Sequence, residues 1–329
     1  MRNLVKKYGT HLAVDHLDFT MRSGRIYGFL GPNGAGKSTT MNIMTGYLGA
    51  TEGEVLIDGH DILKEPEKAK RHIGYLPEQP PLYLDMTVRE YLEFAAELKG
   101  IAREKRKEQI TEAEKLVKIK DTEHRLIKNL SKGYRQRVGL AQAVLGFPEI
   151  IILDEPTVGL DPKQIIEIRN LIRGLARKHT VILSSHILAE VREVCDHILI
   201  ISRGRLVASD TPENLEKMLG EHDQIELETD AQPSQVRLIL KNMPGIESVE
   251  TRTDSAGKTW AKITEKKGED VRESVFRVFA GAQIPLLTLK ATGTTLEDVF
   301  MELTQKDTVP KAFSDKTKRE EAENDAGSV

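Results

Sequence analysis

The stretch of sequence that decides the fold is Gly31-Pro32-Asn33-Gly34-Ala35-Gly36-Lys37-Ser38-Thr39. It matches the pattern G-x-x-x-x-G-K-[ST], in which glycines let the backbone approach the phosphates of a nucleotide closely. Successive N–H groups of such a loop form a nest for an anion, and the N-terminus of the following helix adds to it. A glycine-rich turn without a ligand is the alternative, but the fixed spacing and the Lys-Ser pair disfavour it. The residues predicted to bind the nucleotide are Gly31, Asn33, Gly34, Gly36, Lys37, Ser38 and Thr39.

Apolar runs and helical spacing alternate around this loop. Arg25–Leu30 is an apolar segment that leads into the loop, and Ser38–Leu48 has helical spacing after it. Farther along, Ile150–Leu153 is a continuous apolar run, as expected for a strand that is buried on both faces. Strands that alternate with helices are typical of a parallel sheet that is covered on both sides. The sequence therefore predicts an α/β fold of the P-loop type.

Two acidic residues, Asp154 and Glu155, directly follow the buried run. The carboxyl ends of parallel strands meet at the crevice where ligands bind. Lys37 can reach the β- and γ-phosphates, the Ser38 hydroxyl can ligate Mg²⁺, and Asp154 is the expected partner of that ion, directly or through a water. Glu155 alternates to the other side of the strand and can polarise an attacking water as general base. Two acids at a strand end can also be purely structural, but a phosphate loop in the same domain disfavours that interpretation.

A further segment, Leu130–Arg137 with the sequence LSKGYRQR, lies between the loop and the acidic pair. It resembles the signature segment of ABC ATPases, and its place in the chain is the place that the family gives it. The resemblance extends over about Leu4–Val207. It implies roles for four further residues: adenine stacking for Tyr8, the Q-loop for Gln79, the D-loop for Asp161 and the switch histidine for His186.

The resemblance also implies that ATP and Mg²⁺ are bound between two such domains arranged head to tail. One domain offers the phosphate loop and the acidic pair, and the other offers Ser131 and Gly133 to the γ-phosphate, with Asp161 near the water. The residues that would carry catalysis are Glu155, His186, Lys37 and Gln79. Those that would hold Mg²⁺ are Ser38, Gln79 and Asp154.

Three of these assignments have structural alternatives. Tyr8 can be a half-exposed strand aromatic, His186 a satisfied core histidine and Gln79 a loop glutamine. The sequence neighbours of His186 and Gln79 fit the family, which favours the functional interpretation. The signature departs from the usual pattern at Tyr134, where the family has Gln, although some exporter ATPases share this form. The resemblance also implies a few more residues before Leu4 than this chain carries.

The pattern changes beyond Ser209, where a polar segment precedes a second group of elements. Their order, strand-helix-strand-strand-helix-strand, predicts a small α+β domain of the ferredoxin-like type. We expect an ABC nucleotide-binding domain over 1–210, with an antiparallel β subdomain and a helical subdomain. A linker helix over 211–222, a ferredoxin-like accessory domain over 223–304 and a disordered charged tail over 305–329 follow it.

The composition restricts the classes of function. Apolar residues make up 39 % and charged residues 30 % of the chain, which is the balance of a globular protein. The net charge of −3 provides no basic footprint, so no nucleic-acid partner is expected. The lone cysteine, Cys195, and the lack of a signal peptide indicate a cytosolic location. No apolar run reaches about 18 residues, so another chain would have to span any membrane.

Three segments, Glu78–Tyr83, Thr87–Glu90 and Thr295–Phe300, resemble bacterial exporter ATPases of the drug, antibiotic and gliding-motility group. The resemblance implies an ATP-hydrolysing subunit at the cytoplasmic face of a bacterial-type membrane, working as a homodimer with a separate integral membrane permease. Two alternatives stay open: an importer ATPase with a regulatory C-terminal domain, and a non-transport ABC protein that acts on ribosomes or DNA. A single phosphate loop and the lack of sustained heptads disfavour the second.

Overall fold

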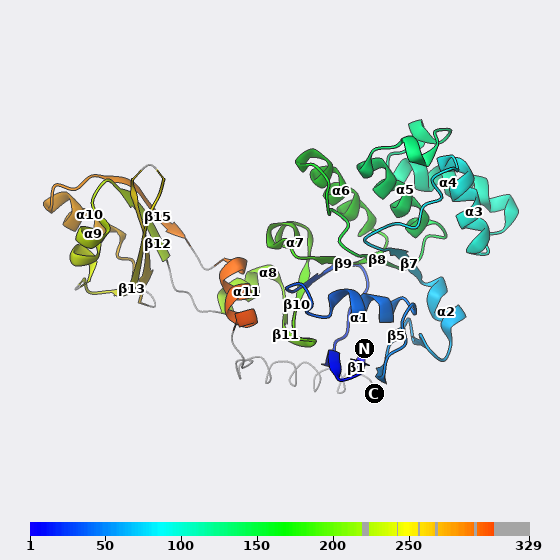
Figure 1. Cartoon of the computed structure of the whole chain (residues 1–329), viewed down its shortest axis with the longest axis horizontal. Helices are drawn as coiled ribbons and strands as arrows, with labels where there is room; N and C mark the ends of the chain where they lie inside the picture. Colours follow the sequence, from blue (N-terminus) through cyan, green and yellow to red (C-terminus); the bar gives the residue numbers. More distant parts are fainter. Residues whose placement is uncertain (219–223, 242, 256, 267–268, 293–294, 306–329) are drawn as a thin grey trace. The chain divides into compact units, whose positions relative to one another are not determined.

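The computed structural model describes residues 1–218, 224–241, 243–255, 257–266, 269–292 and 295–305. They form two units (Figure 1): one spans Met1–Pro212 and takes in the described residues from Leu303 on, and the other spans Glu213–Glu302. The predicted tail lies outside the described residues except for Gln305, and so does the predicted linker from residue 219 on. Among the described residues, no helix is long and apolar enough to cross a membrane.

A six-stranded sheet forms the centre of the first unit. Its elements are β3 (Ile26–Leu30), β7 (Ile73–Leu76), β8 (Ile150–Leu153), β9 (Thr180–Ser185), β10 (His197–Ser202) and β11 (Arg205–Asp210). They lie in the order β11-β10-β3-β9-β8-β7, and all neighbours are parallel except β10 and β11. Strand β3 is buried along its whole length, which explains its apolar run. The predicted α/β fold is confirmed.

Helices cover both faces of this sheet. Figure 1 shows α1 (Lys37–Met44) on one face and α6 (Pro162–Leu175) and α7 (Leu188–Val194) on the other. Helix α1 directly follows the phosphate loop but ends before the predicted Leu48. Gly46 adopts φ 67°, a left-handed conformation that favours glycine and stops a helix.

An antiparallel sheet lies beside α1 and consists of β1 (Arg2–Tyr8), β2 (His11–Leu17) and β4 (Glu52–Glu54), in the order β2-β1-β4. A short hairpin of β5 (Leu56–Ile57) and β6 (His60–Asp61) follows. One core cluster joins this sheet and α1 to the parallel sheet, through side chains that include Leu4, Val14, Phe29, Met41 and Ile182. The hairpin that carries Tyr8 is thereby held at a fixed place relative to the phosphate loop.

A helical part is inserted between β7 and β8. It contains α3 (Val88–Leu98), α4 (Arg103–Leu116), the short 3-10 turns Lys120–Thr122 and Ile127–Asn129, and α5 (Lys132–Val144), with α2 (Pro66–Arg71) preceding β7. Helix α3 begins with a capping box, in which Thr87 and Glu90 satisfy each other's backbone N–H groups. Ser131 caps the N-terminus of α5 by accepting from the Tyr134 N–H at 3.4 Å. The predicted signature segment therefore forms the start of a helix.

The second unit is a four-stranded antiparallel sheet with two helices. Its elements are β12 (Gln224–Thr229), α9 (Pro233–Leu240), β13 (Ile246–Thr253), β14 (Thr259–Glu265), α10 (Arg272–Gly281) and β15 (Leu286–Thr292). The strand order is β13-β14-β12-β15, which is the split βαβ arrangement that the sequence predicts. Alternate residues of β12 and β14 are buried with α9 and α10 in one core that includes Ile225, Ile263 and Phe279. Two helices, α8 (Pro212–Met218) and α11 (Leu296–Gln305), flank these elements in the chain.

Candidate active site

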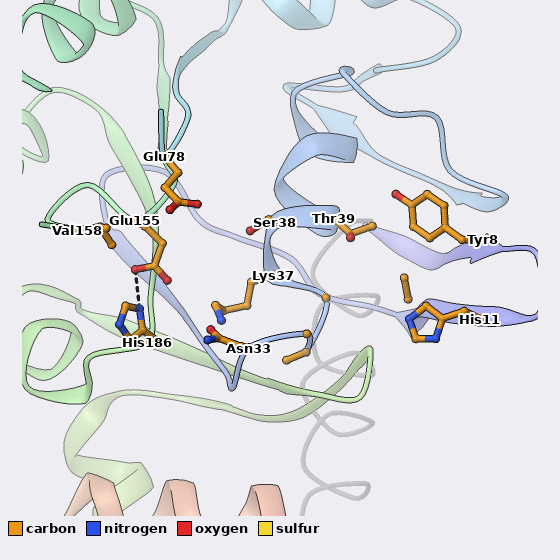
Figure 2. Close-up of a pocket in the computed structure, with 14 residues that line it drawn as sticks. Tyr8, His11, Asn33, Lys37, Ser38, Thr39, Glu78, Glu155, Val158 and His186 are labelled. Atoms are coloured by element: carbon orange, nitrogen blue, oxygen red, sulfur yellow. Dashed lines mark hydrogen bonds and ion pairs between the residues drawn. The ribbon is translucent and has the colours of Figure 1, made fainter. Parts of the chain in front are cut away.

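A cavity of about 440 Å³ opens in the first unit where the phosphate loop meets the ends of β8 and β9. Figure 2 shows that its side chains come from the β1–β2 hairpin, the phosphate loop with the start of α1, and the segments that follow β7, β8 and β9. The two parallel strands end at the same edge of the sheet, which brings Glu155 and His186 to this cavity. The sequence-predicted residues that line it are Tyr8, Asn33, Gly34, Gly36, Lys37, Ser38, Thr39, Glu155 and His186.

The phosphate loop is closed by its own lysine. The Nζ atom of Lys37 donates to the carbonyl of Gly31 at 2.7 Å and to that of Pro32 at 3.2 Å. Burial lowers the pKa of Lys37, while the nearby carboxylates of Glu155 and Asp154 act in the opposite direction. The ammonium is therefore largely desolvated, which suits it to pairing with phosphate oxygens.

The N-terminus of α1 has the features of an anion site. Its cap is Gly36, at φ 102°, which makes no side-chain cap hydrogen bond to the first turn. The first turn also carries no acidic residue that would repel an anion. A side chain at position 36 would collide with the neighbouring strand, because an added Cβ would lie 2.5 Å from the carbonyl oxygen of Ala13. Glycine is required here by both the backbone conformation and the space.

Ser184 connects the two acidic residues at the end of β8. Its hydroxyl donates to Oδ1 of Asp154 at 2.6 Å and accepts from the backbone N–H of Glu155 at 2.8 Å. Asp154 is buried and does not line the cavity, whereas Glu155 does. The sequence prediction that the two carboxylates point to different sides agrees with this arrangement.

Glu155 and His186 face each other across the cavity edge (Figure 2). Oε2 of Glu155 lies 3.0 Å from Nδ1 of His186. A carboxylate held by an imidazole, next to a phosphate loop, can orient a water and accept its proton. The pair is the chemical core of the candidate site.

Tyr8 and His11 form the outer wall of the cavity. They pair directly across the β1–β2 hairpin, whose two-residue loop contains Gly9 at φ 58°. Directly paired residues share one face of a ladder, and both rings point toward the cavity in Figure 2. The exposed fraction of Tyr8 is 48 %, so its ring is available to stack on a base. The adenine contact of Tyr8 stays a prediction.

Sequence reasoning missed two polar residues of the lining, His11 and Glu78. The signal for His11 was present, because Gly9-Thr10 is a two-residue hairpin loop that places Tyr8 and His11 opposite each other. Glu78 carried no signal beyond its position before Gln79 in the segment that follows β7.

The remaining predicted residues lie outside this cavity: Gly31, Gln79, Ser131, Gly133, Asp154 and Asp161. Ser131 and Asp161 are exposed at the N-termini of α5 and α6, where each caps its helix. Gly133 is covered by Gln164, since an added Cβ would lie 2.7 Å from Oε1 of that side chain. The signature segment and the predicted D-loop residue thus lie near each other through Gln164, whose N–H donates to Oδ1 of Asp161 at 2.9 Å.

The residues predicted to hold Mg²⁺ fit that ion by their chemistry. They supply a hydroxyl from Ser38, an amide oxygen from Gln79 and a carboxylate from Asp154, and Mg²⁺ prefers hard oxygen ligands together with waters and phosphates. Ser38 lines the cavity, and the Asp154 carboxylate is close enough to Lys37 to oppose in part the lowering of the Lys37 pKa by burial. In the part of the chain that the structure describes, no group of three or more His, Cys, Asp or Glu residues forms a metal site of another kind.

Comparisons with known proteins agree with this geometry. The family described as "ABC transporter" matches residues 14–158. An uncharacterized ABC transporter ATP-binding protein, YhcH of Bacillus subtilis, is 38 % identical over 92 % of this chain and 95 % of its own length. The bacitracin transport ATP-binding protein BcrA of Bacillus licheniformis is 33 % identical over 92 % of this chain and 95 % of its own length.

A solved structure is also similar. It is a dimeric post-hydrolysis state of the ATP-binding cassette MJ0796 with ADP and Pi, with 28 % sequence identity and a TM-score of 0.58. The match covers 64 % of this chain and 97 % of that one. The likeness therefore concerns one nucleotide-binding cassette.

Proposed function

Because this chain belongs to the ABC transporter family as an ATP-binding subunit with ATPase chemistry, we propose that it drives export through a separate membrane permease. The observation that carries the proposal is that only some of the predicted site residues line the cavity. The cavity gathers the phosphate loop, Glu155 and His186, whereas Ser131, Gly133 and Asp161 lie outside it on exposed or covered helix starts. A second copy, placed head to tail, would supply these groups to the γ-phosphate.

The mechanism of hydrolysis follows from positioning and charge, because phosphoryl transfer to water requires little covalent chemistry from the protein. The loop N–H groups and Lys37 hold the triphosphate, and Tyr8 stacks on its base. Glu155 orients the attacking water and accepts its proton, and His186 holds the Glu155 carboxylate at the 3.0 Å contact. Bound Mg²⁺, held by Ser38, Asp154 and Gln79, would neutralise charge on the phosphate oxygens.

The γ-phosphate couples this chemistry to movement. In the proposed dimer it is the one group that both copies contact, through Lys37 of one and Ser131 and Gly133 of the other. Its presence favours the closed pair and its loss favours opening, because a ligand shifts an equilibrium only by what it binds differently in the two states. An ATP-driven closure of this kind can do work on a membrane partner.

Relatives support the transport assignment. YhcH and BcrA align with 92 % of this chain, including the second unit, and BcrA is named for bacitracin transport. Since the described residues contain no helix that could cross a membrane, the proposed place of action is the cytoplasmic face, docked on the permease. The proposed direction is export, and a homodimer is the simplest pair because this chain has one complete set of site residues.

The direct test is to capture the partner. The Glu155→Gln variant is tagged, given ATP and Mg²⁺, and purified from detergent-solubilised native cells, with Ser131→Arg as the matched control that should not close. We expect a polytopic membrane protein with Glu155→Gln and much less of it with Ser131→Arg. Ribosomes or nucleic acid in place of a membrane protein would overturn the transport function. If a membrane protein does co-purify, ATP-dependent uptake of substrate into inside-out vesicles would establish export.

A further inference from the structure

The backbone of Glu155 is strained. Its φ is 46°, in the left-handed region that residues other than glycine seldom occupy. Such a conformation persists only where the surroundings hold it in place, and it tends to occur at functional sites. The groups that hold Glu155 are therefore part of the site, even where they touch no substrate.

One of these groups acts on the amino side of the strained residue. The Ser184 hydroxyl accepts from the Glu155 N–H at 2.8 Å and donates to Asp154 at 2.6 Å. Ser184 is fully buried on β9, so its position is fixed by the sheet. This contact sets the direction in which the chain leaves β8.

A second group acts on the carboxyl side. Thr157, two residues after Glu155, donates its hydroxyl to Oε2 of Glu190 at 2.5 Å. The hydroxyl of Ser185 lies 3.4 Å from the same oxygen and donates to it. The three residues have exposed fractions of 5 % for Thr157, 1 % for Ser185 and 5 % for Glu190. One buried carboxylate on α7 thus holds the segment that follows Glu155 and the residue that precedes His186.

We propose that Glu190 is a positioning residue for ATP hydrolysis. Its buried carboxylate ties the Glu155 segment to the His186 segment and so keeps the side chains of Glu155 and His186 in contact with each other. The proposal rests on the proposed role of Glu155 as general base. A charged acceptor is suited to this place, because two hydroxyl donors converge on one oxygen and charge-assisted hydrogen bonds are stronger than neutral ones. A buried carboxylate without such donors would be costly, so the three side chains stabilise one arrangement.

The test separates positioning from binding. In Glu190→Ala, kcat should fall at least about tenfold, because small displacements of catalytic groups have large effects on rate. The dissociation constant for a fluorescent ATP analogue should stay within about twofold of wild type, since the phosphate loop and Tyr8 are untouched. Glu190→Gln keeps an oxygen that can accept from Thr157 and should recover most of the rate. Glu193→Ala is the control on the same helix: this residue pairs with Arg169 at the surface and should leave kcat unchanged.

A double variant provides a readout that a purely structural role would not produce. If Glu190 acts through the Glu155–His186 pair, adding Glu190→Ala to Glu155→Gln should slow hydrolysis no further. A further loss in the double variant, or a wild-type kcat in folded Glu190→Ala, would overturn the proposal. Equal losses in kcat and ATP affinity would also overturn it.

The outcome is distinct from that of the proposed function. If Glu155→Gln hydrolyses ATP slowly but Glu190→Ala has the wild-type kcat, only the positioning role of Glu190 is contradicted. If Glu155→Gln itself has the wild-type kcat, the general base on which the proposed function depends is contradicted. Should Glu190→Ala fail to fold, Thr157→Val removes the same hydrogen bond from the other side and leaves Glu190 in place. An unchanged kcat in that variant would contradict the proposal.

Discussion

At the scale of single residues, Lys37 connects the phosphate loop to the acidic end of β8. Its ammonium donates to two carbonyls of the loop and interacts electrostatically with the carboxylates of Asp154 and Glu155. A triphosphate would offer this buried cation stronger acceptors than the two carbonyls do. The Lys37 side chain therefore stabilises the loop and is also placed to bind the phosphates.

Replacing Lys37 by alanine should weaken ATP binding by roughly 100-fold, because hydrogen bonds to charged groups in a desolvated site contribute a few kcal/mol. Equilibrium binding of a fluorescent ATP analogue measures this loss. Lys68→Ala is the control, since Lys68 of α2 pairs with Glu65 and does not line the cavity. Unaltered affinity in Lys37→Ala would show that the phosphates bind elsewhere.

The sequence predicted which residues meet in the cavity more fully than it predicted how they are held. The phosphate loop and Glu155 were found because the motif spacing and a strand end determine where they lie, and His186 was found through the resemblance to ABC ATPases. The left-handed backbone of Glu155 and its support by Glu190 were not predictable, since they depend on contacts between segments far apart in the chain. His11 was missed although its pairing with Tyr8 follows from a short hairpin loop.

At the scale of elements, close packing of α7 on β3 sets the position of the segment that carries His186 and Glu190. Gly28 of β3 makes this approach possible, because an added Cβ would lie 2.6 Å from Cγ1 of Val191 and 2.8 Å from Sγ of Cys195. The strand bounds were predictable within one residue here, but the need for glycine at position 28 was not, because nothing in a strand pattern shows which helix lies above it.

Gly28→Ala should lower the free energy of unfolding by about 1–3 kcal/mol, as overpacking of a filled core does. Urea denaturation followed by circular dichroism measures the change. Gly174→Ala, in α6 with no atom within 4 Å of an added Cβ, is the control and should be neutral or slightly stabilising. Equal stability of the two variants would contradict the close approach of α7 to β3.

Helix α3 provides a pH-dependent prediction. Burial raises the pKa of the Tyr91 phenol from 10.0 to about 12. Because the folded pKa lies above the unfolded one, the stability due to the neutral phenol is fully present below about pH 10 and is lost as the pH rises toward about 12. Tyr91→Phe should therefore lose less stability than wild type over this range in urea titrations. Tyr47→Phe, at an exposed ring, should follow the wild-type curve; identical curves for all three proteins would contradict the burial effect.

At the scale of the whole molecule, the chain combines a nucleotide-binding cassette with a second unit in which strands and helices follow a different order. The alternation of strands and helices predicted the parallel sheet, and the alternation of polar and apolar residues predicted the strands of the antiparallel sheet in the second unit. Strand order was predicted for the second unit only through the split βαβ pattern, because local sequence does not say which strands pair. The predicted domain limits stay a prediction, with part of them outside the described residues.

The division of the site between two copies is the central claim, and the oligomeric state of Glu155→Gln tests it most directly. Light scattering after size exclusion, with saturating ATP and Mg²⁺, should give a dimer for this variant and a monomer with ADP. Adding Ser131→Arg to it should leave ATP binding intact and abolish the dimer. A Glu155→Gln protein that binds ATP but stays monomeric, or a Ser131→Arg double variant that still dimerises, would contradict the account.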